Sequence, residues 1–164
     1  MPITYPEAKD FVAALKQPLD HPSVARLFAD LGLSWTQAVP LSQGLDHYDL
    51  SRPDLGIALA FDGAHAVFED TPRNPDGGPF VLLNCGFWGF EKEYVAYPGP
   101  LWSGIEFSDS LEQVKAKLGE PTRINNRRGI VIVYRWEFEA FTLSIQWADA
   151  ARIRVVSYWM KDVR

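Results

Sequence analysis

One cysteine and three histidines are the side chains of this sequence that could act as a nucleophile and its base. Cys85 with His47 or His65 would make a thiolate and imidazole pair, which is suited to nucleophilic catalysis. The fold would have to bring the pair together, because neither histidine is a sequence neighbour of Cys85. A lone cysteine beside Leu83 and Phe87 is more often a small buried side chain. We therefore expect no catalytic residue.

Other patterns that could bind a metal or a cofactor are weak or absent. His47 and Asp49 are two positions apart, so on a strand they would share a face and could begin a metal site. A third ligand is not evident. Zinc-protease, paired-cysteine, esterase and nucleotide-loop motifs do not occur in the sequence. The sequence predicts neither a metal nor a cofactor.

The stretch 84–104, NCGFWGFEKEYVAYPGPLWSG, combines aromatic side chains with many glycines and prolines. Glycine and proline at this density interrupt both helices and strands, so we interpret the stretch as a linker. Two roles stay open for it. Its rings could fill the seam between two halves of the fold, or they could form an exposed recognition loop flanked by acidic residues. The residues of such a loop are Trp88, Glu91, Glu93, Tyr94 and Tyr97.

Composition is that of an ordinary folded protein. Of the 164 residues, 47% are hydrophobic and 13% aromatic, which excludes a disordered chain and favours a fold rich in sheet. The formal charge of −5 disfavours nucleic acid, since basic residues gather only in the short stretch 123–128. No signal-like or membrane-spanning apolar run occurs, and a single cysteine suits a reducing compartment. We expect a cytoplasmic protein that binds neither nucleic acid nor membrane.

Two similar segments recur along the chain, SVARLFADLG at 23–32 and SLEQVKAKLG at 110–119. In each, apolar residues follow helical spacing and lie on one face. Gly32 and Gly119 suit the left-handed position that follows a helix end. The sequence therefore predicts two amphipathic helices and a duplicated arrangement.

Strands are predicted after each helix. The first part has them at 45–50, on both sides of an Asp62–Gly63 turn, and at 80–84, while the second part has them at 129–138 and on both sides of a turn at Asp149. Sequential strands joined by short turns are antiparallel. The predicted class is α+β, with two tandem helix-plus-strand halves that form one continuous or two adjoining antiparallel sheets and carry their helices on one face.

The expected organisation is a single domain over residues 1–164. Residues 1–83 form the first half and include an additional N-terminal helix, residues 84–104 form the aromatic linker, and residues 105–164 form the second half. Alternation in the second half also separates an apolar strand face from a polar one. The polar stripe adds candidate partner-binding residues, namely Arg135, Glu137, Ser144, Gln146 and Tyr158.

Tandem halves of this kind resemble the beta-lactamase-inhibitor-like fold, in which two repeats form one antiparallel sheet with a concave binding face. The resemblance covers roughly residues 20–160 and rests on the repeated S-x(7)-L-G helices, in particular on GIEFSDSLEQVKAKLGEP at 104–121. Secreted inhibitors with this fold carry disulfides, which one cysteine cannot form. The chain is therefore more similar to a cytoplasmic immunity protein of a bacterial polymorphic or contact-delivered toxin system.

This resemblance implies a non-enzymatic binding protein that neutralises a cognate toxin by covering its active site. From the acidic charge of the chain, the expected partner is a toxin with a basic active-site cleft. Two other functions stay open. One is a small-ligand-binding protein or enzyme with a site between the halves near Cys85, and the other is an accessory or assembly protein of the same fold.

Overall fold

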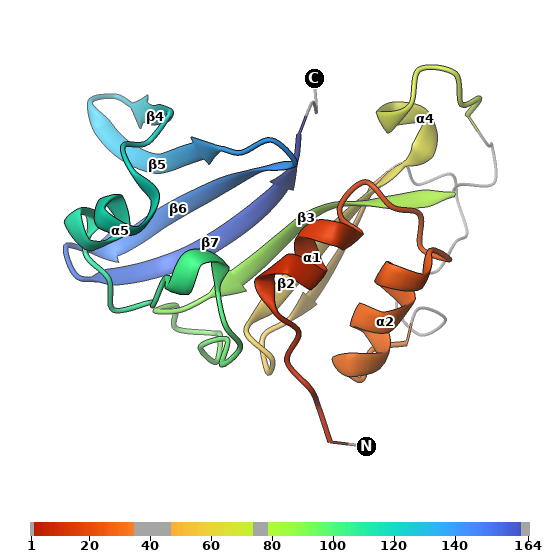
Figure 1. Cartoon of the computed structure of the whole chain (residues 1–164), viewed down its shortest axis with the longest axis horizontal. Coiled ribbons are helices and arrows are strands. Elements are labelled where there is room, and N and C mark those ends of the chain that lie inside the picture. Colours follow the sequence, from red (N-terminus) through yellow and green to blue (C-terminus); the bar gives the residue numbers. More distant parts are fainter. Residues whose placement is uncertain (1, 35–46, 74–78, 162–164) are drawn as a thin grey trace.

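The structure, a computed structural model, describes residues 2–34, 47–73 and 79–161. Within these residues seven strands form one sheet, accompanied by four α-helices and a short 3-10 helix, η1 (Figure 1). The helices are α1 (Ala8–Ala14), α2 (Pro22–Asp30), α4 (Ala64–Val67), η1 (Trp102–Gly104) and α5 (Leu111–Leu118). The strands are β1 (His47–Arg52), β2 (Ile57–Gly63), β3 (Phe80–Trp88), β4 (Arg123–Arg127), β5 (Ile130–Glu137), β6 (Phe141–Asp149) and β7 (Arg152–Met160).

The strand order across the sheet is β1-β2-β3-β7-β6-β5-β4, and every neighbouring pair is antiparallel. The first three strands and the last four therefore meet at β3 and β7. There Gly86 lies opposite Ser157, and Phe87 lies opposite Val156. The predicted α+β class is confirmed, and of the two predicted arrangements, one continuous or two adjoining antiparallel sheets, the structure has the first.

The helices α1 and α2 cover the sheet at β2 and β3 (Figure 1). Phe11 of α1 packs edge-on against Phe87, with ring centroids 4.7 Å apart, and Phe28 of α2 lies 6.1 Å from Phe61. These four rings are buried, and they belong to one hydrophobic core. Gly32 follows α2 with a φ of 62°, the left-handed conformation expected from the sequence.

The helix α5 covers the same face of the sheet at β5 and β6 (Figure 1). Ser110 and Gln113 form a capping box at its start, because each side chain accepts a hydrogen bond from the backbone N–H of the other residue. Beyond its end, the carbonyl of Gly119 accepts a 2.9 Å hydrogen bond from Nε1 of Trp136. We call the face that carries α1, α2 and α5 the helical face, and the opposite one the open face.

Several predicted elements are confirmed, and others are corrected. The helices α2 and α5, the strand β5 and the β6–β7 hairpin match the sequence prediction, whereas only residues 47–50 of the predicted strand 45–50 fall within the described residues. The Asp62–Gly63 pair is not a hairpin turn, since β2 runs through Gly63 and α4 begins at Ala64. The predicted linker starts inside β3, because residues 84–88 pair with β7.

Candidate binding surface on the open face of the sheet

None of α1, α2 and α5 covers the open face, so we treat its side chains as the candidate binding surface. Strand register places one row of these side chains across all seven strands. From β1 to β4 the row is Ser51, Ala58, Gly86, Ser157, Ser144, Arg135 and Arg123. Its middle is made of small residues, while larger side chains lie at both sides of the face.

Trp88 and Tyr94 form an aromatic cluster at one side of the open face. Their rings stack with centroids 4.5 Å apart and an interplanar angle of 24°, and the Tyr94 hydroxyl lies 2.5 Å from Oγ of Ser51. The guanidinium of Arg154 lies 6.0 Å from the Trp88 ring and bonds the Glu91 carboxylate, which lowers the pKa of Glu91. The loop after β3 therefore folds back over the sheet and leaves both rings half-buried.

Two glycines allow this loop to approach the sheet closely. A Cβ atom at Gly56 would lie 2.2 Å from the carbonyl oxygen of Val95, and one at Gly89 would lie 2.6 Å from that of Ile153. Gly56 also has a positive φ of 69°, a conformation that strongly favours glycine. Gly89, one of the glycines that suggested a linker, and Gly56, which precedes β2, thus serve as points of close contact between the loop and the sheet.

Two of the predicted partner-binding tyrosines lie inside the protein, which corrects the prediction for both. Tyr97 is 3% exposed, and its hydroxyl donates a 3.0 Å hydrogen bond to the carbonyl of Pro6. Tyr158 is fully buried on the helical face, where its hydroxyl accepts from the backbone N–H of Trp102. Burial raises the pKa of both hydroxyls. Neither side chain is at the surface for a partner.

A β-bulge explains why alternation misplaces Tyr158. Gln146 pairs with Val155 and Trp147 pairs with Ile153, so Arg154 is an extra residue in β7. An extra residue reverses the inside-outside phase of the strand beyond it. Arg154 consequently reaches the open face. Tyr158, four residues later, would share that face in a regular strand but points into the core because of the bulge.

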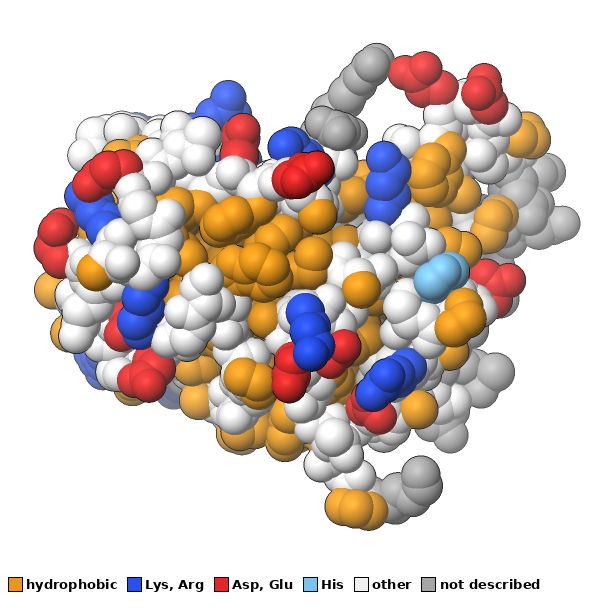
Figure 2. All heavy atoms as spheres, in the orientation of Figure 1, with side chains coloured by type: hydrophobic (Ala, Val, Ile, Leu, Met, Phe, Trp, Pro, Cys, Tyr) orange, Lys and Arg blue, Asp and Glu red, His pale blue; other side chains and the backbone are white. Residues whose placement is uncertain are grey.

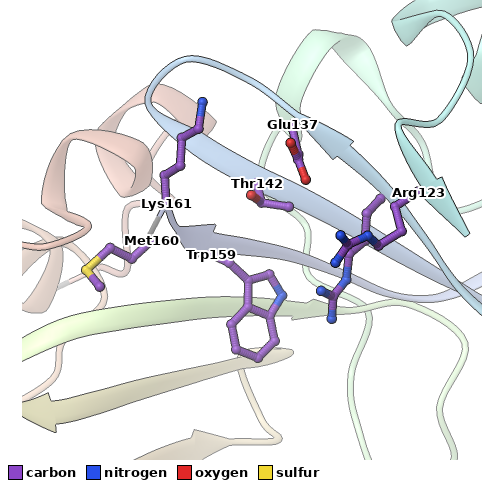
Figure 3. Close-up of a pocket in the computed structure, with 7 residues that line it drawn as sticks. Arg123, Glu137, Thr142, Trp159, Met160 and Lys161 are labelled. Atoms are coloured by element: carbon purple, nitrogen blue, oxygen red, sulfur yellow. The ribbon is translucent and has the colours of Figure 1, made fainter. Parts of the chain in front are cut away.

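The second cluster is a pocket of about 420 Å³ on the β4, β5, β6 and β7 part of the sheet (Figure 3). Its lining residues are Arg123, Arg135, Glu137, Thr142, Trp159, Met160 and Lys161, and we call it the arginine pocket. Alternation correctly placed Arg135 and Glu137 on this face. The sequence analysis missed Arg123 and Trp159. Trp159 lies on the same face of β7 as Ser157, but the bulge in β7 hid which residues of that strand face outward.

Trp159 is held in place at the edge of this pocket. It is 36% exposed, and its Nε1 donates a 2.9 Å hydrogen bond to Oγ of Ser144. Ser144 is only 8% exposed, so it positions the indole ring and is not itself an open contact surface. Of the other predicted residues, Gln146 is half-buried and Glu93 is exposed in the loop after β3.

Charge in the arginine pocket is unbalanced. Arg123 and Arg135 lie directly opposite each other on β4 and β5, and like charges in that position destabilise a sheet. Within the described part of the chain, neither guanidinium forms an ion pair, and the Nε of Arg135 is buried without a hydrogen-bond acceptor. Lys161, whose Nζ donates to the carbonyl of Phe138, adds a third cation, against the single carboxylate of Glu137.

Cys85 and His47 lie on opposite faces of the sheet. Cys85 is fully buried opposite Leu59, and burial raises the pKa of its thiol. His47 is on the open face, with Nδ1 2.5 Å from the carboxylate of Asp62 and Nε2 3.1 Å from that of Asp49. No group of three or more histidine, cysteine or acidic side chains among the described residues could hold a metal ion. Cys85 and His47 therefore do not form a nucleophile and base pair.

The helical face also leaves some apolar surface uncovered. In Figure 2, apolar side chains gather over the sheet between α5 and α1. On this face Trp102 packs against Phe141 and Phe138, with ring centroids 4.7 Å and 5.8 Å apart, and the rings of Trp102 and Phe138 are half-buried.

Comparison with known proteins adds no family. No family profile matches the chain, and searches of curated proteins and of solved structures found no match. None of the helices in residues 2–34, 47–73 and 79–161 has both the length and the apolar character that crossing a bilayer requires. The fold and the surface define the class only as an α+β protein with one antiparallel sheet and a polar, aromatic open face.

Proposed function

We propose that this protein is a non-enzymatic binding protein that inhibits another protein, as an immunity protein does for its cognate toxin, and that it docks through the open face. The observation that best supports the proposal is the placement of half-exposed aromatic rings on both sides of that face. Trp88 and Tyr94 lie on one side, and Trp159 lies on the other. Large aromatic side chains next to charged ones are the usual anchors of protein interfaces.

The row of small residues between these clusters supports the same proposal. Ala58, Gly86 and Ser157 present little side-chain bulk above the sheet. A protruding loop or helix of a partner would therefore meet the backbone of the sheet at the centre and aromatic side chains at both ends. Such a shape suits a masking inhibitor, which has to fill or cover a partner's active site.

We also propose that the chain consists of two tandem repeats. The helices α2 and α5 pack on the same face, and each is followed in the chain by antiparallel strands. The two strand sets meet at β3 and β7, so the open face is shared between them. In this arrangement the linker residues Trp88 and Tyr94 lie at the junction of the repeats.

The partner and the compartment follow from charge and from Cys85. The net charge of the whole chain, −5, favours encounter with a basic partner, such as a toxin with a basic active-site cleft, although the cations of the arginine pocket oppose that attraction at one side of the docking face. Association with such a partner should slow markedly at high salt. A buried free thiol suits the cytoplasm, where an immunity protein meets an incoming toxin.

No comparable observation favours a ligand site or an enzyme centre near Cys85. Its side chain lies in the packed core, and a ligand would have to displace core residues such as Leu59 and Phe87 to reach it. The pocket on the open face lies instead beside β4 and β5. We therefore retain inhibition of a partner protein as the function that the geometry supports best.

Co-expression with the product of the adjacent upstream gene, followed by affinity capture, tests this proposal. We expect a stable complex and protection of cells that express the neighbour. Tyr94→Ala and Trp159→Ala should each weaken the complex by about 2 kcal/mol, roughly thirtyfold. Ile124→Ala is the matched control, because Ile124 is an exposed side chain that strand register places on the helical face.

Two outcomes would contradict the proposal. One is the absence of any complex or protection with the products of neighbouring genes. The other is a complex that Ile124→Ala weakens as much as the open-face substitutions do, since binding would then not use the open face.

A further inference from the structure

We propose that the arginine pocket binds a ligand that carries a carboxylate or phosphate group beside a flat apolar body. The proposal concerns the protein by itself and does not depend on the inhibitor function. It rests on three observations in the pocket: two opposed guanidinium groups, a buried N–H without an acceptor, and an indole ring held beside them.

The first observation is the direct pairing of Arg123 with Arg135. Two cations opposite each other on neighbouring strands destabilise a sheet unless an anion lies between or above them. Some arginines elsewhere in the described residues have a carboxylate partner, since Arg52 pairs with Asp54 and Arg152 pairs with Asp149. Arg123 and Arg135 differ from these arginines because they lie directly opposite each other without a carboxylate partner among the described residues.

The second observation is the Nε of Arg135. This atom is buried, and no acceptor among the described residues reaches it. Buried N–H groups are nearly always hydrogen-bonded, so an unpaired one at a pocket wall indicates where a ligand acceptor belongs. A planar carboxylate or a phosphate matches the fork of donors that a guanidinium presents.

The third observation is the size and apolar wall of the pocket. A volume of about 420 Å³ exceeds what a single oxyanion fills and falls in the range of small-molecule sites. Trp159 forms one wall, and its ring orientation is fixed by the hydrogen bond to Ser144. Figure 3 shows the Arg123 side chain and the indole ring of Trp159 on the same side of the strands, while Met160 points away. Strand register places Arg135 on that face as well. A flat body can therefore stack on the indole while its anionic group meets the arginines.

Glu137 refines the ligand class. Its carboxylate lines the same pocket as the three cations, so it repels a second negative group placed near it. It can also accept a hydrogen bond from a hydroxyl or an amine of the ligand. The pocket chemistry thus fits a ligand with a single anionic group better than one with anionic groups at both ends.

Titration with simple probes, followed by NMR of the 15N-labelled protein, tests the proposal. The probes are benzoate, phenyl phosphate, acetate, inorganic phosphate and the neutral benzamide. The indole N–H signal of Trp159 is assigned by comparison with Trp159→Phe, since the chain has six tryptophans. We expect benzoate or phenyl phosphate to shift the Trp159 indole and Arg135 Nε signals saturably, with a Kd of about 1–10 mM. Benzamide should bind at least about tenfold more weakly.

Variants identify the groups responsible. Arg123→Gln and Arg135→Gln should each weaken benzoate binding by about tenfold or more, whereas Arg127→Gln should leave it unchanged. Arg127 is the matched control because it lies on β4 but does not line the pocket. Thermal melting of each variant shows whether it remains folded, and we expect that neither glutamine variant is destabilised.

The probes also separate the sources of the anion. Phenyl phosphate binding more tightly than benzoate would assign the site to phosphate ligands, and the reverse order would assign it to carboxylates. Equal affinities for acetate and benzoate would show that the ligand needs no flat apolar body. The carboxylate of an acidic protein side chain could then occupy the pocket equally well. Loss of saturable binding with every anion, or equal binding of benzamide and benzoate, would overturn the proposal altogether.

Discussion

Arg123 on β4 and Arg135 on β5 lie directly opposite each other on the open face, and no carboxylate among the described residues forms an ion pair with either. Two unpaired cations directly opposite each other on neighbouring strands lower the stability of a sheet, so folding alone does not account for them. The pair therefore indicates a surface whose charge serves binding at some loss of stability.

Neutralising one member of this pair should stabilise the free protein. We expect Arg123→Gln to raise the free energy of unfolding by about 0.2–1 kcal/mol, because the like-charge contact is removed. Urea unfolding at low salt measures the change, and added salt should diminish it. Arg127→Gln, opposite Ile130, should show no such gain. An unchanged or lower stability for Arg123→Gln would contradict the repulsion.

The Trp88 and Tyr94 stack should contribute to stability as well as to binding. Because both rings are half-buried against each other, Trp88→Ala should lower the free energy of unfolding by about 1–2 kcal/mol. This is less than the roughly 3 kcal/mol or more expected for a fully buried ring. Partner affinity should fall by about 2 kcal/mol in the same variant. Loss of stability with unchanged affinity would assign the stack to folding alone.

Tyr97 and Tyr94 provide a matched comparison within one loop. Tyr97→Phe removes the donor to the buried carbonyl of Pro6 and should lower the free energy of unfolding by about 1 kcal/mol or more. Tyr94→Phe removes a contact with the exposed Ser51, where water can replace the lost partner, so its effect should be smaller. Chemical denaturation of both variants gives the comparison, and the reverse order would contradict the burial assigned to Tyr97.

His47 should make stability weakly dependent on pH. Its hydrogen bond to Asp62, together with Asp49, raises the pKa of His47 above the ordinary value of 6.5. Because the pKa of His47 is higher in the folded state than in the unfolded state, protonation of His47 stabilises the fold. This stabilisation is fully present below the unfolded-state pKa and is lost as the pH rises through the folded-state pKa. Since the side chain is 52% exposed, the effect should stay under about 1 kcal/mol. Denaturation of wild type and His47→Gln at pH 5.5 to 8.5, a range of about three pH units, should show the difference fall with increasing pH.

Gly56 should tolerate substitution poorly. In Gly56→Ala the new Cβ would lie 2.2 Å from the carbonyl oxygen of Val95, in a backbone with positive φ, so we expect a loss of about 2–4 kcal/mol. Gly129→Ala is the control, since Gly129 also has a positive φ but no atom within 4 Å of the new Cβ. Its loss should be only about 1 kcal/mol. Equal melting temperatures for the two variants would show that the loop after β3 can move away from β2.

The sequence by itself determined the elements whose periodicity is local. Helical spacing located α2 and α5, and alternation located β5 and β6 and placed Arg135 and Gln146 on the open face. These predictions succeed because the residues that bury one face of a helix or strand recur at a fixed interval along the chain. They also identified the α+β class and the antiparallel sheet.

Only the tertiary structure decided how the local elements share surfaces. The strand β4 has the polar sequence RINNR, so its place in the sheet depends on pairing with β5 and not on its own pattern. The bulge at Arg154 reverses the phase of β7, which sends Tyr158 into the core. The aromatic linker has no period at all, and long-range packing selected Tyr97 for the core and Trp88 for the open face. Contacts between residues distant in the chain set these outcomes, because the free energy of burial depends on which surfaces meet.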